Sequence, residues 1–171
     1  MIALYIALVF CITVFLILKL KKTNNYPQTP YGFKAKLLFL DDGSSRGFAF
    51  FNRSLNVGAT PDAIYKKRNR KDLMLELKSR KGPVYESDIA QAKAGVLATN
   101  GKYAFDQILI KTSTHQRFID LPRSMKTLEK ELMPLIKLAR NIKQGKVVTQ
   151  KNISRNKCMS CRHFKTCNPK I

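Results

Sequence analysis

Two short stretches decide how this sequence is interpreted: Gly58-Ala59-Thr60-Pro61-Asp62-Ala63-Ile64 and Leu73-Met74-Leu75-Glu76-Leu77-Lys78. Successive side chains of a strand point to opposite faces, so the second stretch predicts a strand that is buried through its leucines. Glu76 and Lys78 then leave the other face together, about 6 to 7 Å apart along the backbone. With Asp62, they predict a site where carboxylates hold a divalent ion and an ammonium faces a phosphate.

The segments around these stretches alternate between strand and helix patterns. A turn-forming segment, 41–45, predicts a hairpin between the first two strands. Strands are predicted at 34–40, 47–51, 63–67, 73–78 and 103–111, with 118–121 as a short extension or partner. Helices are predicted at 86–99 and at about 122–144, where Pro134 introduces a kink. This order predicts an α/β or α+β domain whose helices cover a small mixed sheet.

Composition indicates a polyanionic partner. The chain has 171 residues, room for one globular domain, and 44% hydrophobic residues are enough for a core. Its formal net charge is +21, and no Asp or Glu follows Glu131 while Lys and Arg continue to Lys170. Nucleic acid is the first candidate partner, DNA ahead of RNA, and an anionic membrane surface is the second. The alternative is a basic tail that only keeps the chain soluble or near lipid.

The first residues predict a membrane anchor. Ile2 to Leu18 is uncharged and almost wholly apolar, and Lys19 follows it directly. As a helix this run is about 26 Å long, and a snorkelling lysine extends it toward the ~30 Å of a bilayer core. No basic segment precedes it, which favours an uncleaved anchor over a signal peptide.

Because the flanking lysines lie on the C-terminal side, the rest of the chain is expected in the cytoplasm, tethered to a single-pass anchor that binds the lipid bilayer through residues 2–18. The predicted organisation is an anchor at 1–22, a linker at 23–32, a globular domain at 33–150 and a basic cysteine-rich tail at 151–171. The tail carries Cys158, Cys161 and Cys167, a spacing that in a reducing compartment indicates metal or cluster ligation before disulfides.

The order of motifs resembles the PD-(D/E)XK nuclease superfamily. Gly58-x-x-Pro-Asp62, Glu76-x-Lys78 and Asp88-x-x-Gln91 at the start of a helix are most similar to RecB-like exonuclease domains, including CRISPR adaptation exonucleases with a C-terminal cysteine cluster. Either of the first two motifs alone would be an ordinary turn or an exposed ion pair. The resemblance covers about Gly58 to Thr99 and implies a restriction-endonuclease-like α/β fold that hydrolyses phosphodiester bonds in DNA.

The resemblance also implies roles for individual residues. Asp62 and Glu76 would bind Mg²⁺ or Mn²⁺, with the backbone carbonyl of Leu77 as a further oxygen ligand. Lys78 would orient or activate the attacking water, and Gln91 would support the site or touch the nucleic-acid backbone. Cations expected beside the site are candidates for phosphate contacts, the alternative being a solvated turn: Lys67, Arg68, Arg70, Lys71, Arg80 and Lys81.

The chain departs from the RecB-like pattern in three places. Gly95 stands where those domains usually carry tyrosine, and no histidine precedes His115, so that Asp41 or Asp42 would have to complete the metal site. The first cysteine of the cluster normally lies upstream, where this chain has only Cys11 inside the predicted anchor. Three alternatives therefore remain for the tail: a 4Fe-4S cluster with one non-cysteine ligand, Zn²⁺ held with the help of His163, or no metal.

Taken together, the sequence predicts a membrane-anchored, Mg²⁺-dependent deoxyribonuclease. The alternative is a catalytically inactive, basic nucleic-acid-binding protein tethered to the membrane, which the missing upstream metal ligand and Gly95 favour. A third possibility makes the cysteine tail the working part, as a redox or zinc-binding interaction module.

Overall fold

The computed structural model describes residues 2–23, 26–44, 47–68 and 70–146. The predicted metal ligands Cys158, Cys161, His163 and Cys167 lie outside these residues. The chain divides into two compact units, Met1–Leu132 and Met133–Ile171, and the sheet and the candidate site belong to the first. The elements are α1 (Ile2–Thr23), β1 (Ala35–Leu40), β2 (Phe50–Asn52), β3 (Val57–Ala59), β4 (Ala63–Lys67), β5 (Asp72–Leu77), α2 (Glu86–Ala98), β6 (Phe105–Lys111), β7 (Gln116–Asp120) and α3 (Met125–Lys143).

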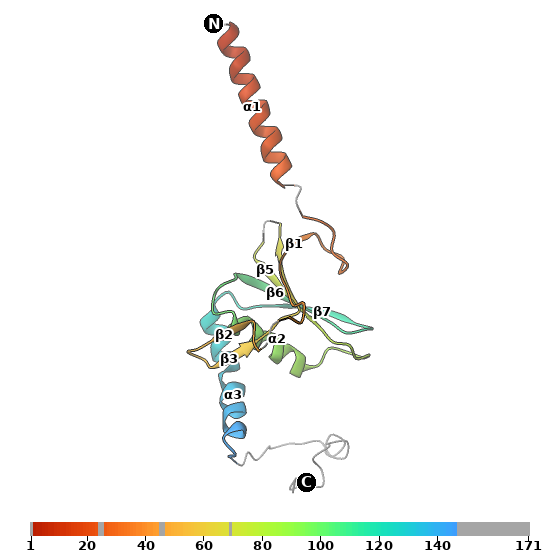
Figure 1. The fold of residues 1–171 in the computed structure, drawn as a ribbon, viewed down its shortest axis with the longest axis vertical. Coiled ribbons are helices and arrows are strands. Elements are labelled where there is room, and N and C mark those ends of the chain that lie inside the picture. The colour runs from red at the N-terminus through yellow and green to blue at the C-terminus, as the bar shows by residue number, and fades with distance from the viewer. Residues whose placement is uncertain (1, 24–25, 45–46, 69, 147–171) are drawn as a thin grey trace. The chain divides into compact units, whose positions relative to one another are not determined.

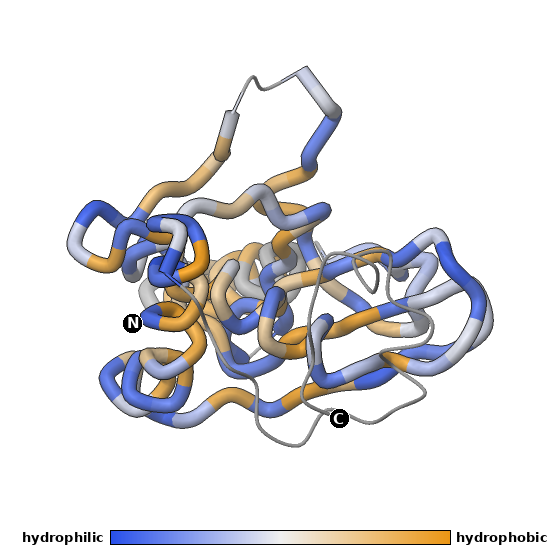
Figure 2. The backbone as a smooth tube through the Cα atoms, turned by 90° about the horizontal axis from the view of Figure 1, so that it is seen from below, coloured by the Kyte–Doolittle hydropathy of each residue, from blue (hydrophilic) through white to orange (hydrophobic). Residues whose placement is uncertain are grey.

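A five-stranded mixed sheet forms the centre of the domain, in the order β1-β4-β5-β6-β7 (Figure 1). β5 and β6 are parallel and are joined through α2, whereas the other neighbours are antiparallel. Hydrophobic and hydrophilic stretches alternate along the backbone (Figure 2). The prediction of a mixed sheet flanked by helices is confirmed, with strand ends within two or three residues of those expected. Pro134 lies inside α3.

Both faces of the sheet are buried around β5. On one face Leu73 and Leu75 join Ala63, Tyr65 and others in a core cluster, against which Tyr31 and Phe33 pack. On the other face Met74 is fully buried beneath α2, close to Gly95. The prediction that β5 is buried through its leucines is confirmed for Leu73 and Leu75 and wrong for Leu77, which is exposed. The prediction was also incomplete, since strand alternation does not show that a helix will cover the second face.

The predicted hairpin between 34–40 and 47–51 is wrong. β1 pairs instead with β4 in the central sheet, with Leu37 opposite Tyr65, and among its side chains Ala35 is buried while Leu37, Leu38 and Leu40 are exposed. β2 instead pairs with β3 to make a separate two-stranded sheet, which contacts α2 (Figure 1). β3 contains Gly58 and Ala59, which carry little side chain, and this explains why a strand pattern was not recognised there.

The residues of the predicted anchor form helix α1. Its apolar side chains from Tyr5 to Leu18 are exposed. Among the helices in the described residues, none is both long enough and apolar enough to cross a membrane.

Candidate functional site

Asp62 and Glu76 lie side by side at one end of the β4–β5 hairpin. Ala63 pairs with Leu75 in the antiparallel ladder, so Asp62 and Glu76 occupy the next opposed positions. Opposed residues of antiparallel strands place their side chains on the same face, here the face of Met74. The Leu77 N–H donates to Asp62 Oδ2 at 2.6 Å, which fixes the aspartate against the end of β5. The structure therefore brings together the two carboxylates that the sequence singled out.

Lys78 and Gln91 complete a polar cluster around Glu76. The Lys78 ammonium donates to Glu76 Oε1 and to Gln91 Oε1, both at 2.9 Å. Gln91 Nε2 in turn lies 3.3 Å from Glu76 Oε1, so the amide contacts both charged groups. The Glu76 and Lys78 side chains are only 12% and 17% exposed, which makes this ion pair stronger than one on the open surface.

The ionisation of Glu76 reflects competing effects. Burial raises the pKa of Glu76, the Lys78 ammonium lowers it, and the nearby carboxylates of Asp62 and Asp88 raise it, with a net upward shift. The negative charge of Glu76 is therefore costly in this protein, and a further cation beside the two carboxylates would relieve that cost.

Asp88 fixes the start of α2, three residues before Gln91. Its carboxylate binds the Arg80 guanidinium and accepts the Tyr85 N–H at 2.8 Å. Burial opposes ionisation of Asp88, but these bonds outweigh it and lower its pKa. Arg80 also lies 4.7 Å from the centre of the Tyr85 ring and donates to the Pro83 carbonyl at 3.2 Å. Asp88 thus holds the start of α2 in place. Gln91 lies on the same side of the helix and contacts Glu76 and Lys78.

A hollow of about 210 Å³ opens beside Glu76 and Gln91. Phe48 lies on its rim, 66% exposed, and its ring packs over Gly58, where an added Cβ would be 2.4 Å from the ring. Gly95 lines the same hollow. Phe48 was not predicted as a site residue, because a phenylalanine in a strand-like run is ordinarily part of the core.

Gly95 has a packing role between α2 and the strands beneath it. A Cβ on Gly95 would lie 3.3 Å from Met74 Sδ and 3.8 Å from the Cβ of Ala59. A side chain much larger than alanine would push α2 away from β5, and with it Gln91 away from Glu76.

The donor set around Asp62 and Glu76 fits a hard divalent cation. Two carboxylates on one face supply oxygen ligands, and water and phosphate oxygens are the usual remainder for Mg²⁺ or Mn²⁺. Asp42 accepts hydrogen bonds from both the N–H and the hydroxyl of Ser44, which lower its pKa, and Asp41 accepts the Gly43 N–H. Neither turn residue completes the set: in the part of the chain that the structure describes, no three His, Cys, Asp or Glu residues gather as metal ligands.

The predicted phosphate-contacting cations divide into separate groups. Lys67 is buried, and its ammonium pairs with Asp106 at 3.1 Å and Gln107 at 2.7 Å. Arg80, held by Asp88, and exposed Lys81 follow β5 near Glu76. The remaining three, Arg68, Arg70 and Lys71, are exposed in the β4–β5 turn, at the opposite end of the hairpin from Asp62 and Glu76.

No model of a known protein family matches the chain, and a comparison with curated proteins found none of similar sequence.

Proposed function

We propose that the protein is a divalent-metal-dependent nuclease that hydrolyses phosphodiester bonds in DNA. One observation carries the proposal: Asp62 and Glu76 are opposed on neighbouring strands, and Glu76 is bonded to both Lys78 and Gln91. This is the residue set that the resemblance to PD-(D/E)XK nucleases requires. A net charge of +21 supports a polyanionic substrate.

Each residue then has a defined task. Asp62 and Glu76 would hold Mg²⁺ or Mn²⁺, which when bound polarises a phosphoryl oxygen and lowers the pKa of a coordinated water. Lys78, already inside the cluster and held from two sides, balances the negative charge that develops on the phosphate. Gln91 keeps the ammonium and the Glu76 carboxylate in place and presents an amide toward the hollow. The carbonyl of Leu77 remains a predicted ligand.

The direct test is cleavage of single- and double-stranded DNA by the full-length protein with Mg²⁺, with Mn²⁺ and with a chelator. Asp62→Asn and Glu76→Gln preserve side-chain shape and remove the charges that hold the metal, so each should abolish cleavage. Glu131→Gln is the matched control, because Glu131 is a half-exposed acid that pairs with Lys93 away from the cluster. Cleavage that survives in both site variants would sink the assignment.

A second candidate function is non-catalytic binding of nucleic acid by the same basic domain. The direct pairing of Lys78 with Glu76 favours it, because it balances the glutamate without a metal. This function predicts DNA binding that weakens steeply with salt and is unchanged by chelator, with no cleavage under any metal. RNA and DNA of one length should be compared in the same experiment.

Two further proposals rest on the sequence alone. A membrane tether through residues 2–18, with the domain in the cytoplasm, predicts that the protein resists alkaline extraction and that deletion of these residues releases it. A 4Fe-4S cluster at Cys158, Cys161 and Cys167 predicts a brown, anaerobically purified protein, whereas Zn²⁺ held with His163 predicts a colourless one containing zinc.

A further inference from the structure

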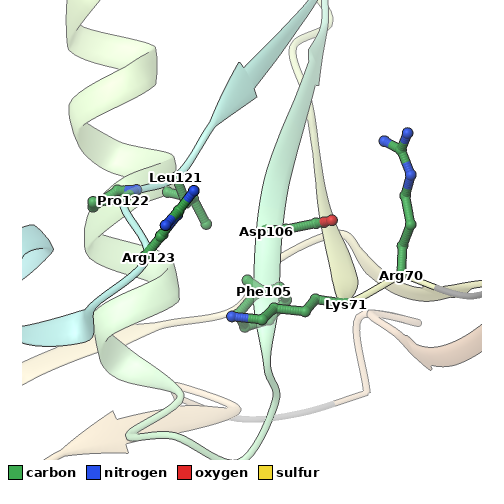
Figure 3. Close-up of a pocket in the computed structure, with 7 residues that line it drawn as sticks. All are labelled: Arg70, Lys71, Phe105, Asp106, Leu121, Pro122 and Arg123. Atoms are coloured by element: carbon green, nitrogen blue, oxygen red, sulfur yellow. The ribbon is translucent and has the colours of Figure 1, made fainter.

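A second hollow, of about 580 Å³, lies at the end of the sheet opposite the candidate site. It is formed where the loop before β5, the start of β6 and the segment after β7 meet (Figure 3). β5 starts at Asp72 and reaches Glu76 at its other end, so the strand separates the two hollows. We call this second hollow the far-end pocket; its volume is in the range of small-molecule sites.

Three cations surround the far-end pocket. Arg70 and Lys71 come from the β4–β5 turn, and Arg123 comes from the segment that leads into α3. All three are exposed, and in the view of Figure 3 Arg70 and Arg123 stand on either side of Asp106. Arginine presents a planar fork of donors that matches phosphate oxygens, so two arginines and a lysine around one hollow indicate an anionic, phosphate-bearing ligand.

Asp106 restricts what that ligand is. One carboxylate oxygen, Oδ1, is buried and paired with Lys67 at 3.1 Å, yet the side chain is 32% exposed and lines the pocket. A bare phosphate would be repelled by this carboxylate, whereas a ligand with hydroxyl or amino donors would bond to it. Phe105, Leu121 and Pro122 add an apolar wall suited to a ring.

We propose that the far-end pocket binds a nucleoside phosphate, as a free nucleotide or as the 5′-terminal nucleotide of a strand. The phosphate contacts Arg70, Lys71 and Arg123, a sugar or base donor contacts Asp106, and the ring lies against the apolar wall. The binding does not depend on the proposed nuclease activity, because none of these residues belongs to the cluster around Glu76.

The test is calorimetric titration of the full-length protein, in chelator, with thymidine monophosphate, thymidine and inorganic phosphate. Arg123→Gln should weaken binding of the monophosphate about tenfold, the usual loss for one charge-assisted hydrogen bond. Arg53→Gln is the matched control, an exposed arginine in the β2–β3 turn. Asp106→Asn should weaken the monophosphate but not inorganic phosphate, and thermal melting checks that this variant still folds.

Oligothymidylates with and without a 5′-phosphate separate the two sources of the ligand. Saturable binding of the monophosphate supports a free nucleotide, and binding of only the 5′-phosphorylated strand supports a strand end. The proposal is overturned if neither binds, if inorganic phosphate binds as tightly as the monophosphate, or if Arg123→Gln and Arg53→Gln behave alike. Because chelator is present throughout, a failure here is distinct from a failure of DNA cleavage.

Discussion

Replacing Lys78 by methionine tests the cluster most sharply, because it deletes the charge and keeps an unbranched side chain of similar length. In the native protein the ammonium lies 2.9 Å from oxygens of both Glu76 and Gln91. Lys78→Met leaves Glu76 with the Gln91 amide at 3.3 Å as its remaining contact in the cluster. A carboxylate that is only 12% exposed then carries a charge without a cation beside it.

The expected loss follows from that burial. Leaving a hydrogen-bonded charge unpaired costs about 1 to 3 kcal/mol at partly exposed sites, and breaking a fully buried pair costs about 3 to 5 kcal/mol. Since Glu76 retains some exposure, we expect Lys78→Met to lower the free energy of unfolding by about 2 to 3 kcal/mol. Lys93→Met is the control: it breaks a pair whose Glu131 side chain is 46% exposed. That variant should lose about 1 kcal/mol or less.

The pH dependence distinguishes lost charge pairing from lost packing. Burial raises the pKa of Glu76 and Lys78 lowers it, so the pKa rises further in Lys78→Met. The folded variant then binds a proton more tightly than the unfolded chain, and its stability falls as pH rises through that pKa. The stability gap between wild type and variant should therefore be complete at neutral pH and close as Glu76 becomes protonated in acid.

The test is to measure urea unfolding of wild type and Lys78→Met across this pH range, and to measure their DNA cleavage. Cleavage by Lys78→Met should fall at least about 100-fold, as for loss of one transition-state charge contact. A stability gap that stays constant from neutral pH into acid, or a variant that cuts DNA at the wild-type rate, would refute the reasoning.

Three other predictions concern α2 and the rim of the first hollow. Gly95→Tyr should lower the free energy of unfolding, measured in urea, by about 1 to 3 kcal/mol or more, because the ring overpacks against Met74. In Gly95→Ala a gain in helix propensity of up to about 1 kcal/mol offsets the tighter contact. Asp88→Asn should destabilise the protein by about 1 to 2 kcal/mol at neutral pH. Because folding lowers the pKa of Asp88, the difference in stability between wild type and variant should vanish as pH falls through that pKa. A difference that persists in acid would contradict this prediction. Phe48→Ala should weaken DNA binding by about 1 to 3 kcal/mol if a base stacks on the ring, while Phe51→Ala, an exposed neighbour, should not.

The sequence predicted the parts of the site that depend on local pattern. Strand alternation placed Glu76 on the face opposite Leu75, and the Pro-Asp turn placed Asp62 at the start of β4, so the two carboxylates meet once β4 and β5 pair. The expected order of strands and helices was also sufficient for the mixed sheet. These features depend on periodicity and turn chemistry within a few residues.

Distant contacts determined what the sequence did not show. Lys67 is buried because Asp106 and Gln107, on β6, face it across the sheet. Arg70 and Lys71 are near Glu76 in sequence, yet the hairpin carries them to its other end. Nothing in the local sequence around Arg123 indicates a site, because only the fold brings the segment after β7 to the start of β5.

Three contacts between α2 and the segment from β5 to Arg80 hold the helix beside the site. Asp88 bonds to Arg80, which follows β5, and Gln91 bonds to Glu76 near the end of β5. Gly95 packs on Met74, which lies nearer the start of β5. The helix therefore runs antiparallel to β5 and contacts the strand at Glu76 and Met74. In this arrangement a tyrosine at position 95 would point into the sheet. The glycine lets α2 pack closely enough for Gln91 to reach Glu76. Gly95 is then a local solution to helix–sheet packing, and it leaves Glu76, Lys78 and Gln91 in mutual contact.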